Sequence, residues 1–114
     1  MGIQNWSENV ILLNLAKEPD SGEEIQSVCE IISEKPDRDV VVDFSDVDIV
    51  TSSSIARLLK LRKLLHDHRR KLILCSLRPQ TKNIFYVTGL DAVFYFVEDQ
   101  FLALAGLQMA ETEN

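Results

Sequence analysis

The sequence has few of the residues that build metal sites and disulfide frameworks. Among its 114 residues are two cysteines, Cys29 and Cys75, and two histidines, His66 and His68. The cysteines lie far apart within apolar segments, without a CxxC spacing, which predicts buried free thiols. The histidines are two positions apart and point to different sides of a helix, so we expect both to be solvated. The sequence therefore predicts no metal and no cofactor.

Long hydrophobic runs are also missing. No apolar segment approaches the roughly 18 residues that a membrane span requires. The N-terminal residues, Met1 to Trp6, lack a basic region followed by a hydrophobic one. These absences predict a cytoplasmic protein without a membrane span.

The motifs of common enzyme classes are absent as well. The sequence contains no GxGxxG, GxxxxGK[ST], HExxH or GxSxG pattern. Ser52 and His66 would lie about 21 Å apart along one helix, too far for proton transfer. Asp46 and Asp48, with Asp43 nearby, lack the spacing of a calcium-binding loop. The sequence therefore favours a binding protein over an enzyme.

Charge is unevenly distributed along the chain. The net charge is −6, yet residues 57–82 hold nine basic residues and one acidic residue, against three basic and seventeen acidic residues elsewhere. The chain is acidic overall, and no aromatic residue interrupts the basic stretch to stack on a base, which argues against nucleic-acid binding. A surface divided in this way is suited to orienting a charged protein partner.

The hydrophobic pattern alternates between the periods of strands and helices. Apolar runs predict strands at 10–15, 40–44, 72–77 and 93–97, with a shorter strand around Trp6. Helical spacing predicts helices at 22–35, from Ile55 past Leu65, 79–89 and 101–109, before a polar tail at 111–114. The length fits one domain, 1–114, with a core from about 6 to 104. This order of elements predicts an α/β fold with a mixed sheet.

The middle of the chain combines a strand, an acidic loop and a hydroxyl cluster. Asp39 to Phe44 is followed by Asp46 and Asp48, and Thr51-Ser52-Ser53-Ser54 opens a helix. This segment resembles the signature of STAS domains: a hydrophobic strand, Asp-Leu-Ser, a spacer and Asp-Ser-Ser-Gly at the start of a helix. The likeness extends to Val87-Thr88-Gly89-Leu90 and covers about residues 6–104. Thr51 and Ser54 stand where the family motif has Asp and Gly.

The resemblance implies a STAS-like mixed β-sheet with helices stacked mainly on one side, in a bacterial protein similar to the anti-sigma factor antagonists, or anti-anti-sigma factors. It implies transcription regulation through a phosphorylated Ser52, with Thr51 as the alternative. The implied partner is an anti-sigma factor with serine-kinase activity, bound when Ser52 is unphosphorylated, and a serine phosphatase would reverse the modification. The residues implied to contact this partner are Asp46, Asp48, Thr51, Ser52, Ser53 and Ser54. The altered Thr51 and Ser54 favour an alternative, a constitutive STAS scaffold subunit of a stressosome-like or lipid-transport complex.

The hydroxyl cluster also has a purely structural interpretation. Ser or Thr before an apolar-periodic segment is typical of a helix N-cap. We predict that Thr51, Ser52 and Ser53 lie at the start of a helix that begins within two residues of Ser53, with Ser52 exposed. A phosphate on Ser52 should weaken partner binding without unfolding the domain, because attraction to the helix N-terminus offsets repulsion from Asp46 and Asp48.

Overall fold

The computed structural model describes residues 2–112, and the side chains of residues 2–110. The chain forms five strands and four helices within this range, in the order β1 Gly2–Ser7, β2 Val10–Asn14, α1 Asp20–Glu34, β3 Asp39–Asp43, α2 Ser52–Asp67, β4 Leu72–Cys75, α3 Pro79–Val87, β5 Tyr95–Val97 and α4 Gln100–Thr112.

These elements confirm the predicted order of strands and helices, with differences at their ends. The strand around Trp6 has six residues and is longer than β2, not shorter. β5 begins two residues later than predicted, at Tyr95. α4 extends to Thr112 and so includes the first half of the predicted polar tail, whereas residues 113–114 lie outside the described residues.

The five strands form one sheet in which spatial order follows chain order, from β1 to β5. β1 pairs with β2 in the antiparallel sense, and the remaining neighbours are parallel. The predicted α/β fold with a mixed sheet is confirmed. All five residues of β3 are buried, because a central parallel strand is covered on both faces.

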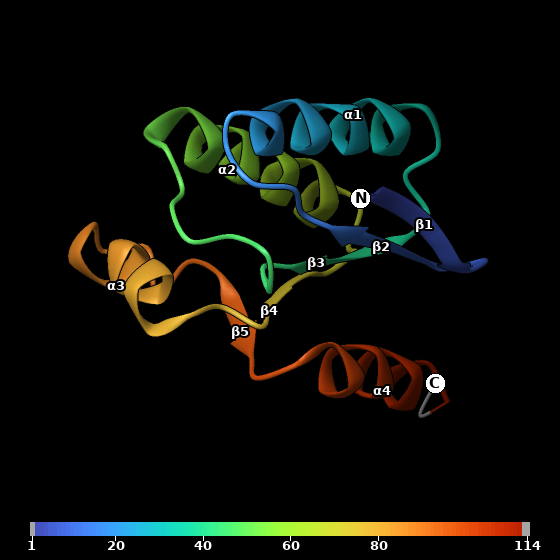
Figure 1. The fold of residues 1–114 in the computed structure, drawn as a ribbon. Helices are drawn as coiled ribbons and strands as arrows, with labels where there is room; N and C mark the ends of the chain where they lie inside the picture. The colour runs from blue at the N-terminus through green and yellow to red at the C-terminus, as the bar shows by residue number, and fades with distance from the viewer. Residues whose placement is uncertain (1, 113–114) are drawn as a thin grey trace.

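The helices occupy the two faces of the sheet unequally. Right-handed crossovers between sequentially ordered parallel strands place their helices on one face. Figure 1 shows α1 and α2 side by side on that face and α4 on the opposite face. α4 follows the last strand, so no crossover constrains it to the first face. None of the described helices combines the length and apolar character needed to cross a membrane.

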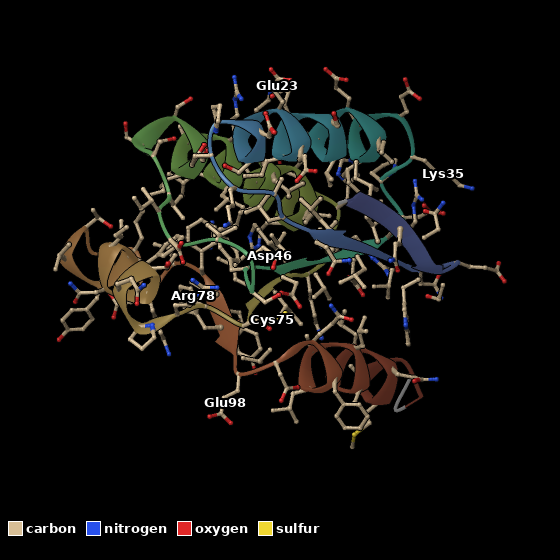
Figure 2. The ribbon with its side chains drawn as sticks, viewed as in Figure 1. Glu23, Lys35, Asp46, Cys75, Arg78 and Glu98 are labelled. Carbon is tan, nitrogen blue, oxygen red and sulfur yellow. The ribbon has the colours of Figure 1, made fainter. Side chains whose placement is uncertain are left out.

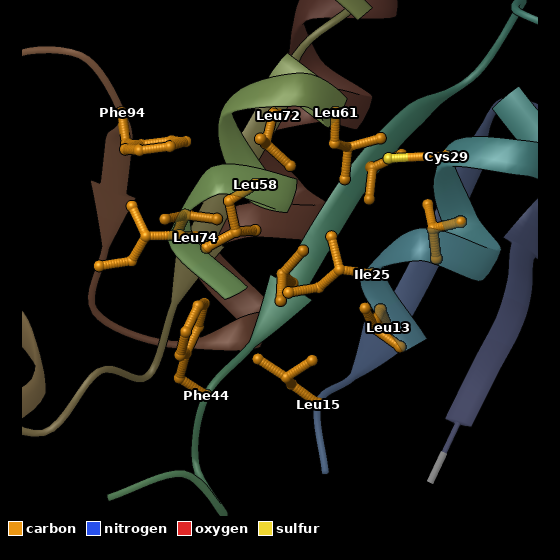
Figure 3. Packing of buried hydrophobic residues seen from close by; sticks show 14 of the residues in the cluster. Leu13, Leu15, Ile25, Cys29, Phe44, Leu58, Leu61, Leu72, Leu74 and Phe94 are labelled. Carbon is orange, nitrogen blue, oxygen red and sulfur yellow. The ribbon is translucent and has the colours of Figure 1, made fainter. Parts of the chain in front are cut away.

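The buried residues form two clusters, one on each face of the sheet. The larger has twenty buried residues and lies beneath α1 and α2 (Figure 3), and Phe85 of α3 joins it. The smaller has eight and lies beneath α4. Alternation along β2 divides its side chains, so that Ile11 and Leu13 enter the first cluster and Val10 and Leu12 the second. Cys29 and Cys75 are buried and free, as predicted, one in each cluster.

Candidate functional site at the start of α2

The predicted site residues lie in the loop between β3 and α2 and in the first turn of α2. Two apolar side chains anchor this loop, since Val47 and Val50 are buried. Asp46, just before Val47, and Asp48, between Val47 and Val50, lie on the surface, exposed as predicted. The buried hydroxyl of Thr81 in α3 donates to the carbonyl oxygen of Asp48 at 2.9 Å. The loop is therefore fixed to the core on one side and presents its acidic residues on the other.

Arg78, at the start of α3, holds the same loop. Its guanidinium forms an ion pair with Asp48 and donates from Nη2 to the carbonyl oxygen of Ser45 at 3.0 Å. Figure 2 labels Arg78 and Asp46, which follow the carboxyl ends of neighbouring strands. Among the described residues Asp46 forms no ion pair. The charge of Asp48 is thus compensated within the molecule, and that of Asp46 is presented to solvent.

The first turn of α2 begins as predicted, within two residues of Ser53. Thr51 is the N-cap, and its hydroxyl oxygen accepts a hydrogen bond from the backbone N–H of Ser54 at 3.2 Å. Ser52 and Ser53 follow and are exposed, which confirms the predicted exposure of Ser52. The hydroxyl of Ser52 donates no hydrogen bond to any described residue, whereas the neighbouring Thr51 and Ser54 hydroxyls are both engaged.

Glu18 is the residue that sequence reasoning missed. It lies in the segment between β2 and α1, 33 residues before Thr51, and its Oε2 accepts three hydrogen bonds. The donors are the backbone N–H of Thr51 at 2.9 Å, the Thr51 hydroxyl at 3.1 Å and the Ser54 hydroxyl at 2.7 Å. Only its place at the carboxyl end of β2, beside the carboxyl end of β3, indicated that it could reach the site.

Hydrogen bonding keeps Glu18 ionised. Burial alone raises the pKa of its carboxyl, but the Thr51 N–H and the hydroxyls of Ser21, Ser54 and Thr51 outweigh that effect. The pKa of Glu18 is therefore below its ordinary value of 4.5. A carboxylate at this position also interacts favourably with the N-terminal end of the α2 dipole.

Ser54 does not share the surface with its two neighbours. It is 1% exposed, and its hydroxyl donates to Glu18 and lies 3.4 Å from the Ser21 hydroxyl of α1. α1 and α2 approach closely here, since a Cβ on Gly22 would lie 3.3 Å from the Ser54 hydroxyl. The structure thus brings Asp46, Ser52 and Ser53 to the surface and turns Ser54 inward, where it ties α2 to α1.

Metal-ligating side chains do not gather here or elsewhere in the described part of the chain. Within it, no three His, Cys, Asp or Glu residues lie close enough together to hold a metal ion. His66 and His68 are both exposed, as predicted. The site therefore consists of hydroxyl and carboxylate groups at a helix N-terminus.

The chain matches a protein family along most of its length. The family model described as the STAS domain matches residues 8–105. The chain belongs to the STAS domain family. A curated relative, BtrV of Bordetella bronchiseptica, is assigned as an anti-sigma factor antagonist. It is 24% identical over 90 residues, which cover 79% of this chain and 78% of BtrV.

Solved structures share the STAS fold at low sequence identity. A variant of RsbS from Moorella thermoacetica has a TM-score of 0.81 at 14% identity, covering 97% of each chain. The Bacillus cell fate determinant SpoIIAA in its phosphorylated form has a TM-score of 0.73 at 14% identity, covering 93% of this chain and 97% of that one. The chain is thus a STAS domain protein that resembles the anti-sigma factor antagonists, which are regulatory binding proteins.

Proposed function

We propose that this STAS protein is an anti-sigma factor antagonist switched by phosphorylation of Ser52. Without phosphate it binds a cytoplasmic anti-sigma factor with serine-kinase activity and so releases a sigma factor. Phosphate on Ser52 prevents this binding, and a serine phosphatase restores it. The observation that carries the proposal is the exposed Ser52 hydroxyl, which has no hydrogen bond to a described residue although it begins a firmly held helix.

The hydrogen bonds at the start of α2 favour Ser52 over Thr51 and Ser54 as the modified residue. The Thr51 hydroxyl donates to Glu18 and accepts from the Ser54 N–H. A phosphate on Thr51 would remove a cap worth about 1 kcal/mol and would place a second negative group against the Glu18 carboxylate. The hydroxyl of Ser54 is buried. Ser52 and Ser53 are therefore the groups that a kinase could reach at the lowest structural cost, and the position in the family motif favours Ser52.

Glu18 also offers a reason for the two departures from the family motif. The motif has Asp at the position of Thr51 and Gly at that of Ser54. Here both hydroxyls donate to the carboxylate of Glu18, so a carboxylate is still present at the helix N-terminus but comes from another segment. We interpret the two substitutions as one exchange, coupled through Glu18. This interpretation supports the switch over a scaffold subunit that requires no phosphate.

A phosphate on Ser52 would change the surface more than the fold. It adds about −1.5 to −2 charges at a helix N-terminus, which attracts anions, but close to the Glu18 carboxylate, which repels them. Arg78 already compensates Asp48, so the repulsion comes from Glu18, which accepts a hydrogen bond from the neighbouring Thr51, and from Asp46 of the acidic loop, which is not ion-paired within the described residues. A partner surface fitted to a neutral hydroxyl would meet a hydrated charge, and mispaired charge at an interface costs several kcal/mol.

Phosphate on the native protein can be measured directly. We expect an intact mass higher by one phosphate in part of the protein purified from its own cells, removed by phosphatase treatment. Peptide sequencing should place that phosphate on Ser52. Modification confined to distant residues such as Ser27 or Ser76 would contradict the proposed site. A lack of the phosphate adduct under all growth conditions would favour the constitutive scaffold.

Affinity for the cognate anti-sigma factor provides the second test. Ser52→Ala should bind almost as tightly as the wild type, and Ser52→Asp at least about 100-fold more weakly, which corresponds to about 2.7 kcal/mol. Ser27→Asp is the matched control, because it adds the same charge at an exposed serine of α1. All three variants should melt near the wild-type temperature. Equal affinity of Ser52→Ala and Ser52→Asp for the anti-sigma factor would contradict the phosphorylation switch and favour the scaffold function.

A further inference from the structure

A cavity of about 510 Å³ lies at the end of the sheet opposite Ser52. It opens between α4, the second half of α2 and the first residues of β4 and β5. The volume falls within the roughly 300–1,000 Å³ range of small-molecule sites. Arg62 of α2 lines it, ten residues after Ser52 and therefore about 15 Å further along the helix axis. This cavity is thus separate from the phosphorylation site proposed above.

Three features of the sequence produce the cavity. β5 is only three residues long and begins with Tyr95 opposite Ile73, so Leu72 has no partner from β5. α4 meets the sheet through the side chains of Ala103, Leu104 and Leu107. Between them Gly106 has no side chain, and a Cβ built on it meets no atom within 4 Å. The space between α4 and this edge of the sheet is therefore left unfilled.

The wall of the cavity is apolar and its rim is basic. Its apolar residues include Leu72, Ile73, Phe94, Val97, Ala103 and Leu107. The basic side chains belong to Arg62, His66, Arg70 and Lys71, and no acidic residue among those whose side chains the structure describes lines the cavity. An apolar wall favours an apolar occupant over water, and a rim of one charge sign favours an occupant of the opposite sign.

Among the described residues, neither Arg62 nor Lys71 has a carboxylate partner. Arg70 is paired with Asp39, its Nε lying 3.1 Å from Oδ1. Arg62 donates from Nε to a neutral acceptor, the carbonyl oxygen of Val93, at 2.9 Å. Lys71 is exposed and, among the described residues, forms no ion pair. The charges of Arg62 and Lys71 are therefore available to an anionic ligand.

We infer that this cavity binds a single-chain amphiphile with a carboxylate or phosphate head. The apolar chain would lie between α4 and the sheet, and the head would contact Arg62 and Lys71. A strongly polar anion such as a nucleotide fits less well, because the wall offers few groups that could pair with its base and sugar. Binding here does not depend on the modification of Ser52.

The inference is tested by titrating the full chain with dodecanoate below its critical micelle concentration. Binding is measured by calorimetry and by changes in the amide chemical shifts. We expect saturable one-to-one binding, with the largest shifts in residues 93–97 and 102–107. Dodecyl phosphate should bind in the same way if the rim accepts either head. Dodecyltrimethylammonium, which has the same tail and a cationic head, should bind at least about tenfold more weakly, and acetate should not bind measurably. Equal binding of the cationic detergent would indicate adsorption to exposed apolar surface and overturn the inference.

Two matched pairs of variants locate the ligand. Gly106→Leu should fill the cavity and weaken dodecanoate binding at least about tenfold, whereas Gly106→Ala adds one methyl group and should bind within about twofold of the wild type. Lys71→Gln should weaken binding about three- to tenfold, and Lys60→Gln, at an exposed lysine of α2 outside the cavity, should not. Unchanged binding by both Gly106→Leu and Lys71→Gln would overturn the inference, and melting curves would verify that each variant is folded.

Discussion

The two faces of the sheet are packed to different degrees. The face beneath α1 and α2 holds twenty buried residues, and the face beneath α4 holds eight. The N-terminus of α2, with Ser52, belongs to the first face, where Glu18, Ser54 and Gly22 fix it against α1. The cavity lies at the end of the sheet beside the second face, where few side chains attach α4. The densely packed face therefore positions a group for modification, and the sparsely packed face leaves room for a ligand.

Truncation of one leucine on each face tests this difference directly. Leu58 of α2 and Leu107 of α4 are 0% and 2% exposed. Leu58→Ala should lower the free energy of unfolding by about 3–5 kcal/mol, within the range for buried leucines. Leu107→Ala should lower the free energy of unfolding by a smaller amount, at least about 1 kcal/mol less than Leu58→Ala does. The reason is that the neighbours of Leu107 already border a cavity and α4 is free to shift. Urea unfolding of both variants measures the two losses, and equal losses would show that α4 is packed as tightly as α2.

Removal of the Glu18 carboxylate should weaken the first face at the site itself. Glu18→Ala leaves the buried Ser54 hydroxyl and the Thr51 N–H without their acceptor, so we expect a loss of about 1–3 kcal/mol in the free energy of unfolding. Glu23→Ala is the control, an exposed acidic residue in the first turn of α1, and should change stability by less than about 0.5 kcal/mol.

The pH dependence of the Glu18→Ala effect follows from the direction of the pKa shift. The pKa of Glu18 is lower in the folded protein than its ordinary value of 4.5. The stabilisation from its carboxylate is thus complete at a pH well above 4.5, and it is lost as the pH falls through 4.5 to the lower folded value. The difference in stability between wild type and Glu18→Ala should shrink over that acidic range. A difference that is constant with pH would mean that the ionised form is not what stabilises α2.

The two buried cysteines report the opening of the two faces separately. Burial raises the pKa of both thiols, that of Cys75 to about 12 with a further contribution from the charge of Asp43. Alkylation at neutral pH therefore requires local opening. Cys75 lies beneath α4 and Cys29 between α1 and α2, so Cys75 should be alkylated by iodoacetamide about tenfold faster or more under native conditions. Mass spectrometry of the two cysteine peptides measures the rates, and equal rates would indicate a single cooperative unit.

The sequence was sufficient to predict what depends on local periodicity. The apolar runs from Val40 to Val42 and from Leu72 to Cys75 form parallel strands, because side chains buried on both faces give continuous hydrophobic segments. Thr51 caps α2 because a hydroxyl before an apolar-periodic segment satisfies a backbone N–H that has no helical partner. The exposure of Ser52 follows from the same start of the helix.

Contacts between distant segments were not predictable from these patterns. Glu18 reaches Thr51 only because β2 and β3 are parallel neighbours whose carboxyl ends meet at one edge. Ser54 is adjacent to the exposed Ser53 in α2 but faces α1. Its burial depends on how closely α1 approaches α2 at Gly22, which the sequence pattern does not indicate. The cavity results from the shortness of β5 and from the lack of a side chain at Gly106. A hydrophobic pattern in the sequence does not indicate where volume is left unfilled.

Alanine at two glycines gives the smallest and most specific test of the difference between the faces. Gly106 lies within α4 and is exposed, and a Cβ there meets no atom within 4 Å. Gly106→Ala should therefore stabilise the protein by about 0.5–1 kcal/mol, the amount by which glycine weakens a helix interior. Gly89, after α3, has a φ of +76°, where a side chain is strained although the space is open, so Gly89→Ala should destabilise by about 1 kcal/mol. Thermal and urea unfolding measure both changes. If Gly106→Ala were instead destabilising, its methyl group would be meeting neighbouring atoms, and the space between α4 and the sheet would be smaller than the structure shows.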